Sequence, residues 1–202
     1  MQEPASVLFS VFNFIGHFYG YRRIQDQLSP TLSNRWMYTA VSIFGMNTWI
    51  WSSVFHSRDV DWTEKLDYFS AMASILFAAC FAFIRIFNLE SRSKLVLLIV
   101  AFVYFIAHVT YLSLWKFDYT YNMIACITVG LSSYVAWIGW YLVNSITLST
   151  NSPLTFTRAK SREKEEFKAY AYKINILIVG MLSVMMFEVL DFPPLWHLID
   201  AQ

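Results

Sequence analysis

Residues 49–70, WIWSSVFHSRDVDWTEKLDYFS, hold the polar positions around which the rest of the chain is organised. An apolar segment ends in Ser52 and His56, a short charged stretch follows, and a second apolar segment opens with Asp67. Ser52 and His56 are four residues apart, so on a helix they lie on one face. If the connection is tight, Asp67 returns to the same end of the helix pair. The pattern therefore predicts a hydroxyl, an imidazole and a carboxylate close together.

The residues alone leave two interpretations of this cluster open. A histidine at the end of an apolar helix commonly anchors that helix at a lipid interface or caps a loop. A hydroxyl one turn away and a carboxylate at the start of the next helix favour a metal or catalytic site instead. Spacing and composition do not decide between these interpretations.

The composition outside this stretch indicates an all-α polytopic membrane protein. Hydrophobic residues make up 57% of the 202-residue chain and charged residues only 14%, whereas a soluble domain carries roughly a quarter charged residues. A net charge of +1 argues against nucleic acid as a partner. Cys80 and Cys126 lie inside apolar segments, so we expect small buried side chains and no disulfide.

Six segments are apolar enough, and near enough to the roughly 20 residues that a spanning helix needs, to cross a bilayer. They lie at about 5–21, 37–56, 67–87, 94–114, 120–143 and 171–190, and a seventh begins at 195–202 after the Pro193-Pro194 turn. The one long connection, 144–170, ends in a basic and acidic run, and we expect a solvated cytosolic loop.

The basic residues predict the orientation of these segments. Most of them lie in or beside the connections after the first, third and fifth segments, whereas the alternate connections carry only Arg58, Lys65 and Lys116. By the positive-inside rule, the first set of connections faces the cytosol. His56 and Asp67 then face the lumen or the cell exterior.

Several motifs resemble those of one known family. W-S-S-V-F-H-S-R-D (51–59) and T-E-K-L-D-Y-F (63–69) are similar to motifs of the Per-type post-GPI-attachment lipid-remodelling phospholipases, relatives of the alkaline ceramidases and the progestin/adipoQ receptors. Further matches are Q-E-P-A-S (2–6), H-V-T-Y-L-S-L (108–114), F-D-Y-T-Y-N (117–122) and E-V-L-D-F-P-P-L (188–195). The resemblance covers nearly the whole chain. It implies a seven-helix bundle of the alkaline ceramidase type, here with six complete helices and a truncated seventh.

The resemblance also implies a chemistry. Members of the family are expected to hydrolyse the sn-2 acyl ester of GPI-anchored proteins in the Golgi or endoplasmic reticulum membrane, at a lumenal zinc site formed by three histidines and a water. On this basis His56 is a metal ligand, Asp67 orients the water or takes its proton, and Ser52 hydrogen-bonds the water or the oxyanion. Glu188 and Asp191 are candidate partners of the last-helix histidines.

The chain departs from the family pattern in the last helix. Gln202 stands where the family has the first histidine of a His-x-x-x-His pair, and the second has no counterpart. His197 lies about 140° around a helix from position 202, so it does not substitute for that ligand. With one of three expected ligands, we expect a truncated chain with impaired activity. A ceramidase-like amide hydrolase and a non-catalytic membrane protein are the alternatives.

Other polar residues carry weaker predictions. His108, in the fourth segment, is expected to make an interhelical hydrogen bond more readily than to take part in catalysis. Asp118 and Asn122 are expected in a lumenal loop.

Overall fold

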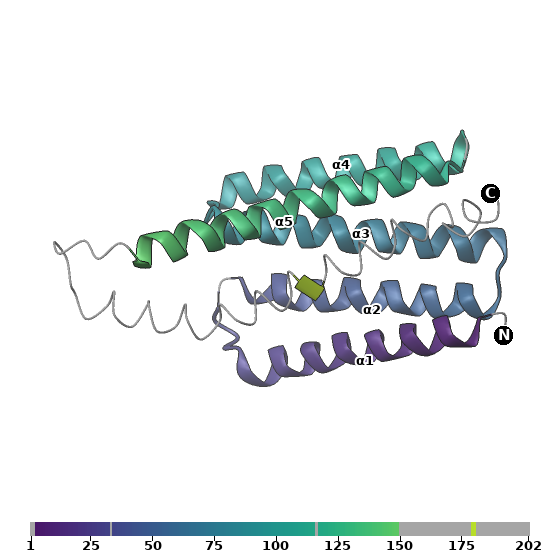
Figure 1. The fold of residues 1–202 in the computed structure, drawn as a ribbon, viewed down its shortest axis with the longest axis horizontal. Coiled ribbons are helices and arrows are strands. Elements are labelled where there is room, and N and C mark those ends of the chain that lie inside the picture. Colours follow the sequence, from purple (N-terminus) through teal and green to yellow (C-terminus); the bar gives the residue numbers. More distant parts are fainter. Residues whose placement is uncertain (1–2, 33, 116, 150–178, 181–202) are drawn as a thin grey trace, which may run out of the picture. The chain divides into compact units, whose positions relative to one another are not determined.

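The computed structural model describes residues 3–32, 34–115, 117–149 and 179–180, and all regular structure in these residues is helical (Figure 1). The helices are α1 (Pro4–Gln27), α2 (Arg35–Ser57), α3 (Asp61–Ile86), α4 (Ser91–Leu114) and α5 (Tyr119–Ser149). The all-α prediction is thereby confirmed for the described residues. The predicted segments 171–190 and 195–202, with Glu188, Asp191 and Gln202, lie outside them except for Val179 and Gly180, which are helical.

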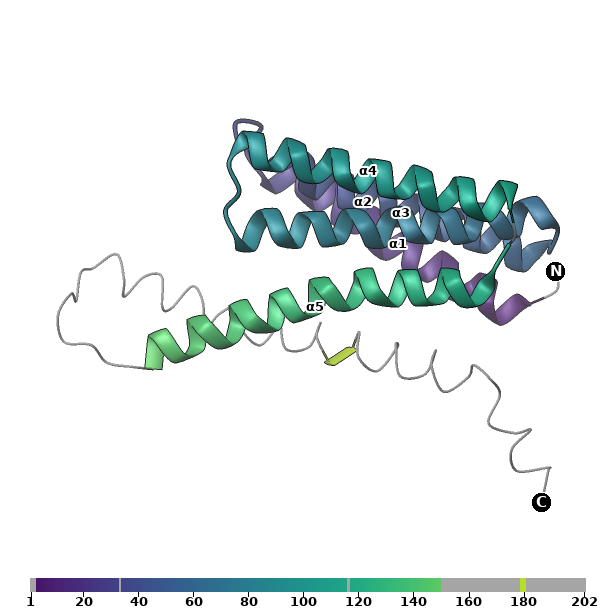
Figure 2. The same ribbon diagram turned by 90° about the horizontal axis from the view of Figure 1, so that it is seen from above.

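The chain divides into two compact units, residues 1–136 and 137–202, and α5 begins in the first and continues into the second. Within the first unit, α1 packs against α2, α2 against α3, and α3 against α4 (Figures 1 and 2). Because consecutive helices run in opposite directions, α1 and α3 begin at the end where α2 finishes. We call this the His56 end. In the second unit, the rings of Trp137 and Trp140 on α5 meet edge to face, 5.8 Å between centroids.

Three of the described helices are long and apolar enough to cross a membrane: α3, α4 and residues 119–143 of α5. The surface of α4 agrees with such a role, since several of its large apolar side chains are each more than half exposed, among them Leu95, Val96, Val100, Phe102 and Val103. An apolar surface of this extent is unusual in water and suits contact with lipid. Membrane spans at α1 and α2, and the complete seven-helix bundle, remain predictions.

The helix boundaries differ from the predicted ones, most at α3. This helix begins at Asp61, so Asp67 lies in its second turn and does not open it. The hydroxyl of Thr63 accepts a hydrogen bond from the Val60 N–H at 3.1 Å, and Asp61 and Glu64 complement the helix dipole in the first turn. A boundary placed by apolarity misses this polar first turn. For the same reason α1 extends past residue 21 to Gln27, and α5 continues to Ser149, into the predicted loop 144–170.

The first three helices approach closely through small and hydroxyl-bearing residues. Gly45 of α2 is buried, and a side chain at this position would overlap the imidazole of His17 on α1. Between α2 and α3, the Thr48 hydroxyl donates to the carbonyl oxygen of Ser70 at 2.9 Å. Small residues and interhelical hydrogen bonds are the usual means by which helices associate in lipid.

Candidate functional site

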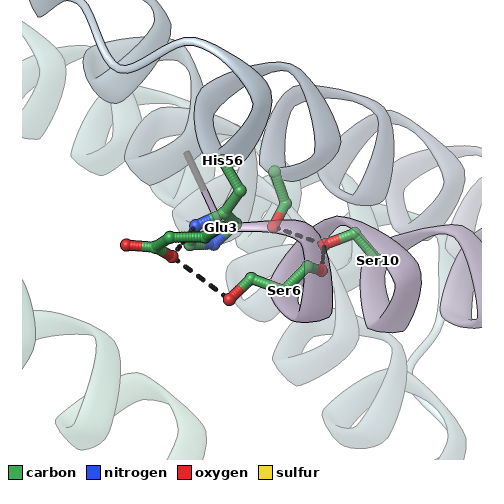
Figure 3. A network of polar contacts seen from close by, with 5 residues as sticks. Glu3, Ser6, Ser10 and His56 are labelled. Carbon is green, nitrogen blue, oxygen red and sulfur yellow. Dashed lines mark hydrogen bonds and ion pairs between the residues drawn. The ribbon is translucent and has the colours of Figure 1, made fainter. Parts of the chain in front are cut away.

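Helix α2 presents Ser52 and His56 at its last turns, where α1 begins. Ser52 is buried, and its Oγ lies 2.9 Å from Oγ of Ser10 on α1. Ser10 donates its single proton to the carbonyl oxygen of Ser6 at 2.9 Å, so in this arrangement Ser52 donates to Ser10 (Figure 3). The lone pairs of Ser52 then remain able to accept a hydrogen bond.

His56 lies at the rim of the helix pair and is held by Glu3, the residue before α1. Its Nδ1 is 2.7 Å from Oε2 of Glu3, and its side chain is 25% exposed. The same Oε2 accepts a hydrogen bond from Ser6 Oγ at 3.1 Å (Figure 3). The backbone N–H of Glu3 also donates to the carbonyl oxygen of His56 at 3.2 Å. Side chain and backbone thus join the residue before α1 to the last turn of α2.

Asp67 approaches the same end from α3 and is partly buried. Its carboxylate lies within electrostatic reach of the His56 ring, so a charge on one group would act on the other. Its neighbours Tyr68 and Phe69 pack on Phe117, with ring centroids 5.6 and 6.4 Å apart, which fixes this turn of α3 against the α4–α5 connection. The structure therefore brings an imidazole and a carboxylate from two helices to one end, and the Ser52 hydroxyl lies one helical turn before the imidazole on α2.

A second polar cluster lies between α4 and the first turn of α5. His108 is 1% exposed, its Nε2 is 3.1 Å from Oδ1 of Asn122, and its Nδ1 is 3.4 Å from the Tyr121 hydroxyl. The predicted interhelical hydrogen bond of His108 is confirmed. The prediction that Asn122 lies in a loop is wrong, because α5 begins at Tyr119 and includes Asn122. Asp118 caps this helix by accepting a hydrogen bond from the Tyr121 N–H at 3.0 Å.

Comparison with known proteins identifies the family. The amino-acid sequence matches the Per1-like family over residues 1–202. The chain belongs to the Per1-like family. It is 37% identical to the protein PER1 homolog of Schizosaccharomyces pombe over 100% of this chain and 56% of that protein. It is 33% identical to the GPI-specific phospholipase A2-like PGAP3 of Homo sapiens, over 99% of this chain and 57% of that protein.

A further relative is the post-GPI attachment to proteins factor 3 of Drosophila melanogaster, which is 32% identical over 100% of this chain and 56% of its own length. The Per1-like chain therefore spans less than three fifths of the length of these curated relatives. No solved structure matches the chain. The family predicted from the motifs is confirmed, while the roles of individual residues remain predictions.

The described residues of the Per1-like chain do not by themselves fit a catalytic zinc. Within residues 3–149, apart from the two undescribed positions, and at residues 179–180, no three His, Cys, Asp or Glu side chains are placed to hold a metal. His56 and Asp67 supply two donors at most, and a catalytic zinc takes three protein ligands. Any further ligand must come from outside the described residues.

Three residues at the start of α1 contact the predicted site residues or each other but are not among the residues predicted from the sequence: Glu3, Ser6 and Ser10. A signal for them was present, because they follow helical spacing on an otherwise apolar segment. Pro4 after Glu3 also predicts the start of a helix at that point. The spacing does not indicate, however, that these three residues face Ser52 and His56.

Proposed function

We propose that the Per1-like chain provides part of the catalytic centre of a hydrolase that removes the sn-2 acyl chain from the lipid of GPI-anchored proteins. The observation that carries this proposal is the placement of His56 and Asp67, from different helices, at one end of the first unit, with Ser52 one turn before His56 on α2. The names of the human and Drosophila relatives support the substrate class, since both refer to GPI. The rest of the catalytic centre belongs to residues outside the described part.

The three residues take distinct roles in this proposal. A water molecule adds to the ester carbonyl carbon while the carboxylate of Asp67 accepts its proton. The bond between the acyl carbon and the ester oxygen then breaks, Asp67 returns the proton to that oxygen, and the fatty acid and the lysolipid alcohol are released. Ser52, whose proton is directed to Ser10, accepts a hydrogen bond from the water and so orients it. His56 is proposed as one zinc ligand, and no step is derived through the metal because its remaining ligands are not among the described residues. Gln202 in place of the first last-helix histidine is the reason to propose impaired activity for this chain alone.

We further propose that the His56 end faces the lumen of the Golgi or endoplasmic reticulum. Basic residues are scarcer in and beside the connections at this end than in and beside those at the opposite end, where they lie in the flanking helix ends. GPI anchors lie in the lumenal leaflet, so a site near a lumenal helix end would meet the acyl ester without crossing the bilayer.

Complementation tests this function. Cells that lack GPI lipid remodelling receive either the 202-residue chain or a chimera in which the fission yeast relative supplies the segments that this chain does not match. Mass spectrometry of lipids released from GPI-anchored proteins measures removal of the sn-2 chain. The chimera should restore removal, and the 202-residue chain should restore little. Full activity of a chimera with alanine at Ser52, His56 and Asp67 would overturn the proposal.

A matched variant controls for damage to α2. Ser53 is the neighbouring serine, and its hydroxyl donates to the carbonyl oxygen of Trp49 in its own helix at 2.8 Å. Ser53→Ala should therefore leave activity within about twofold, whereas Ser52→Ala should reduce it about 10-fold or more. Hydrolysis of ceramide by the chimera, without acyl removal from GPI, would instead support the amide hydrolase.

A further inference from the structure

We infer that Glu3 is a positioning residue that fixes the imidazole of His56, an inference that rests on the proposed role of His56. The two side chains meet at 2.7 Å through Nδ1 and Oε2. Although the two residues lie 53 positions apart in the sequence, a backbone hydrogen bond also joins them at 3.2 Å. Glu3 is therefore held at His56 by its main chain as well as by its side chain.

The local structure explains why Glu3 is in this place. Pro4 occupies the first turn of α1, and Glu3 before it has a non-helical backbone, with φ −132° and ψ 79°. Proline disfavours the helical conformation in the preceding residue, so α1 begins after Glu3. Ser6, one turn along, donates to Oε2 at 3.1 Å and holds the carboxylate toward His56 (Figure 3).

The contact chooses which ring nitrogen is available for chemistry. A carboxylate accepts hydrogen bonds, so Nδ1 of His56 carries the proton, and Nε2 of the neutral ring keeps its lone pair. Among the described residues, Nε2 of His56 has no hydrogen-bond partner. A carboxylate on one nitrogen with the other left free is the arrangement that orients histidine ligands and proton acceptors in metal and catalytic sites.

The contact between Glu3 and His56 adds little to the stability of the fold. The Glu3 side chain is 60% exposed, and exposed ion pairs contribute little to the stability of a fold. What the pair supplies is a fixed ring orientation and a single tautomer. Removal of Glu3 should therefore change the state of His56 much more than it changes the stability of the fold.

Nitrogen NMR of the whole 202-residue chain, labelled with ¹⁵N-histidine in detergent micelles at mildly alkaline pH, tests the inference without an activity assay. The chain has four histidines, and His56→Ala assigns the signals of His56. The unchanged chain should show His56 protonated at Nδ1. Glu3→Ala should move the proton largely to Nε2, the form that free imidazole side chains prefer, and Glu3→Gln should give an intermediate mixture. An unchanged tautomer in Glu3→Ala would overturn the inference.

A matched variant and the activity of the chimera complete the test. Glu90→Gln changes an exposed glutamate at the N-cap of α4 and should leave the His56 signals in place. In the chimera, Glu3→Ala should lower sn-2 acyl removal about 10–100-fold, and Glu3→Asp should recover part of this loss. Activity that depends on His56 but not on Glu3 would overturn the inference about Glu3 and leave the proposed function standing. Activity that depends on neither residue defeats the proposed function, while the tautomer measurement still decides the contact.

Discussion

His56 and His108 both contact a neighbouring helical segment through Nδ1, yet their surroundings differ in exposure and in charge. His108 is 1% exposed and meets an amide and a phenol, which occupy both of its ring nitrogens. His56 is 25% exposed, meets a carboxylate through Nδ1, and lies within the electrostatic reach of Asp67. A buried ring with neutral partners on both nitrogens has no atom left for a substrate. The comparison therefore separates a histidine suited to holding helices together from one suited to chemistry.

Alanine at each histidine should give opposite results, and this is the largest effect that we expect. In the chimera, His56→Ala should lower removal of the sn-2 acyl chain by more than about 100-fold. This loss should exceed the one for Glu3→Ala, because Glu3 only orients His56. Its stability should stay within about 0.5 kcal/mol, because the side chain is partly exposed at a helix end. His108→Ala should instead lower the yield of folded protein and leave activity per folded molecule nearly unchanged.

Acyl removal normalised to folded protein, measured by size-exclusion chromatography in detergent, separates the two outcomes. A His108→Ala chimera that folds normally and is inactive would reverse the assignment. A His56→Ala chimera with full turnover would remove His56 from the site.

The packing that brings α1 to α2 should be nearly as sensitive, and Gly45→Ala tests it. A methyl group at position 45 would overlap the His17 ring, and such overpacking costs roughly 1–3 kcal/mol. The free energy of unfolding in SDS should fall by this amount in the 202-residue chain. His17→Ala removes the obstructing ring, so the double variant should regain most of the loss. Gly139→Ala, where an added methyl meets nothing within 4 Å, is the control, and an equal loss there would show that the effect is not a clash.

The sequence predicted the helices and the Ser52–His56 face because both depend on local spacing. A tight connection is enough to predict Asp67 at the same end, but the start of α3 depends on Thr63 and the acidic first turn, which hydropathy does not register. Apolarity alone places Asn122 in a loop, because the cap at Asp118 is a hydrogen bond and not an apolar signal. Glu3 could not be matched to His56, since only the packing of α1 on α2 brings them together.

The contact between His108 and Asn122 should give the smallest effect, because interhelical hydrogen bonds in lipid contribute about 0.6 kcal/mol on average. A double-mutant cycle with His108→Leu and Asn122→Leu, measured by SDS unfolding of the 202-residue chain, isolates this term. Each single change leaves a buried partner without its hydrogen bond, whereas the double change leaves neither, so the double variant should lose less stability than the sum.

The contact of Tyr121 with Nδ1 of His108 does not contribute to the coupling energy of this cycle, because it is lost in every variant that lacks His108. At 3.4 Å this contact is long for a hydrogen bond, and Tyr121→Phe should cost less than Asn122→Leu. Additive losses would mean that His108 is buried by packing alone. The difference between His108 and His56 would then depend on exposure only. Neutral hydrogen-bond partners would no longer explain why the ring nitrogens of His108 are inaccessible to a substrate.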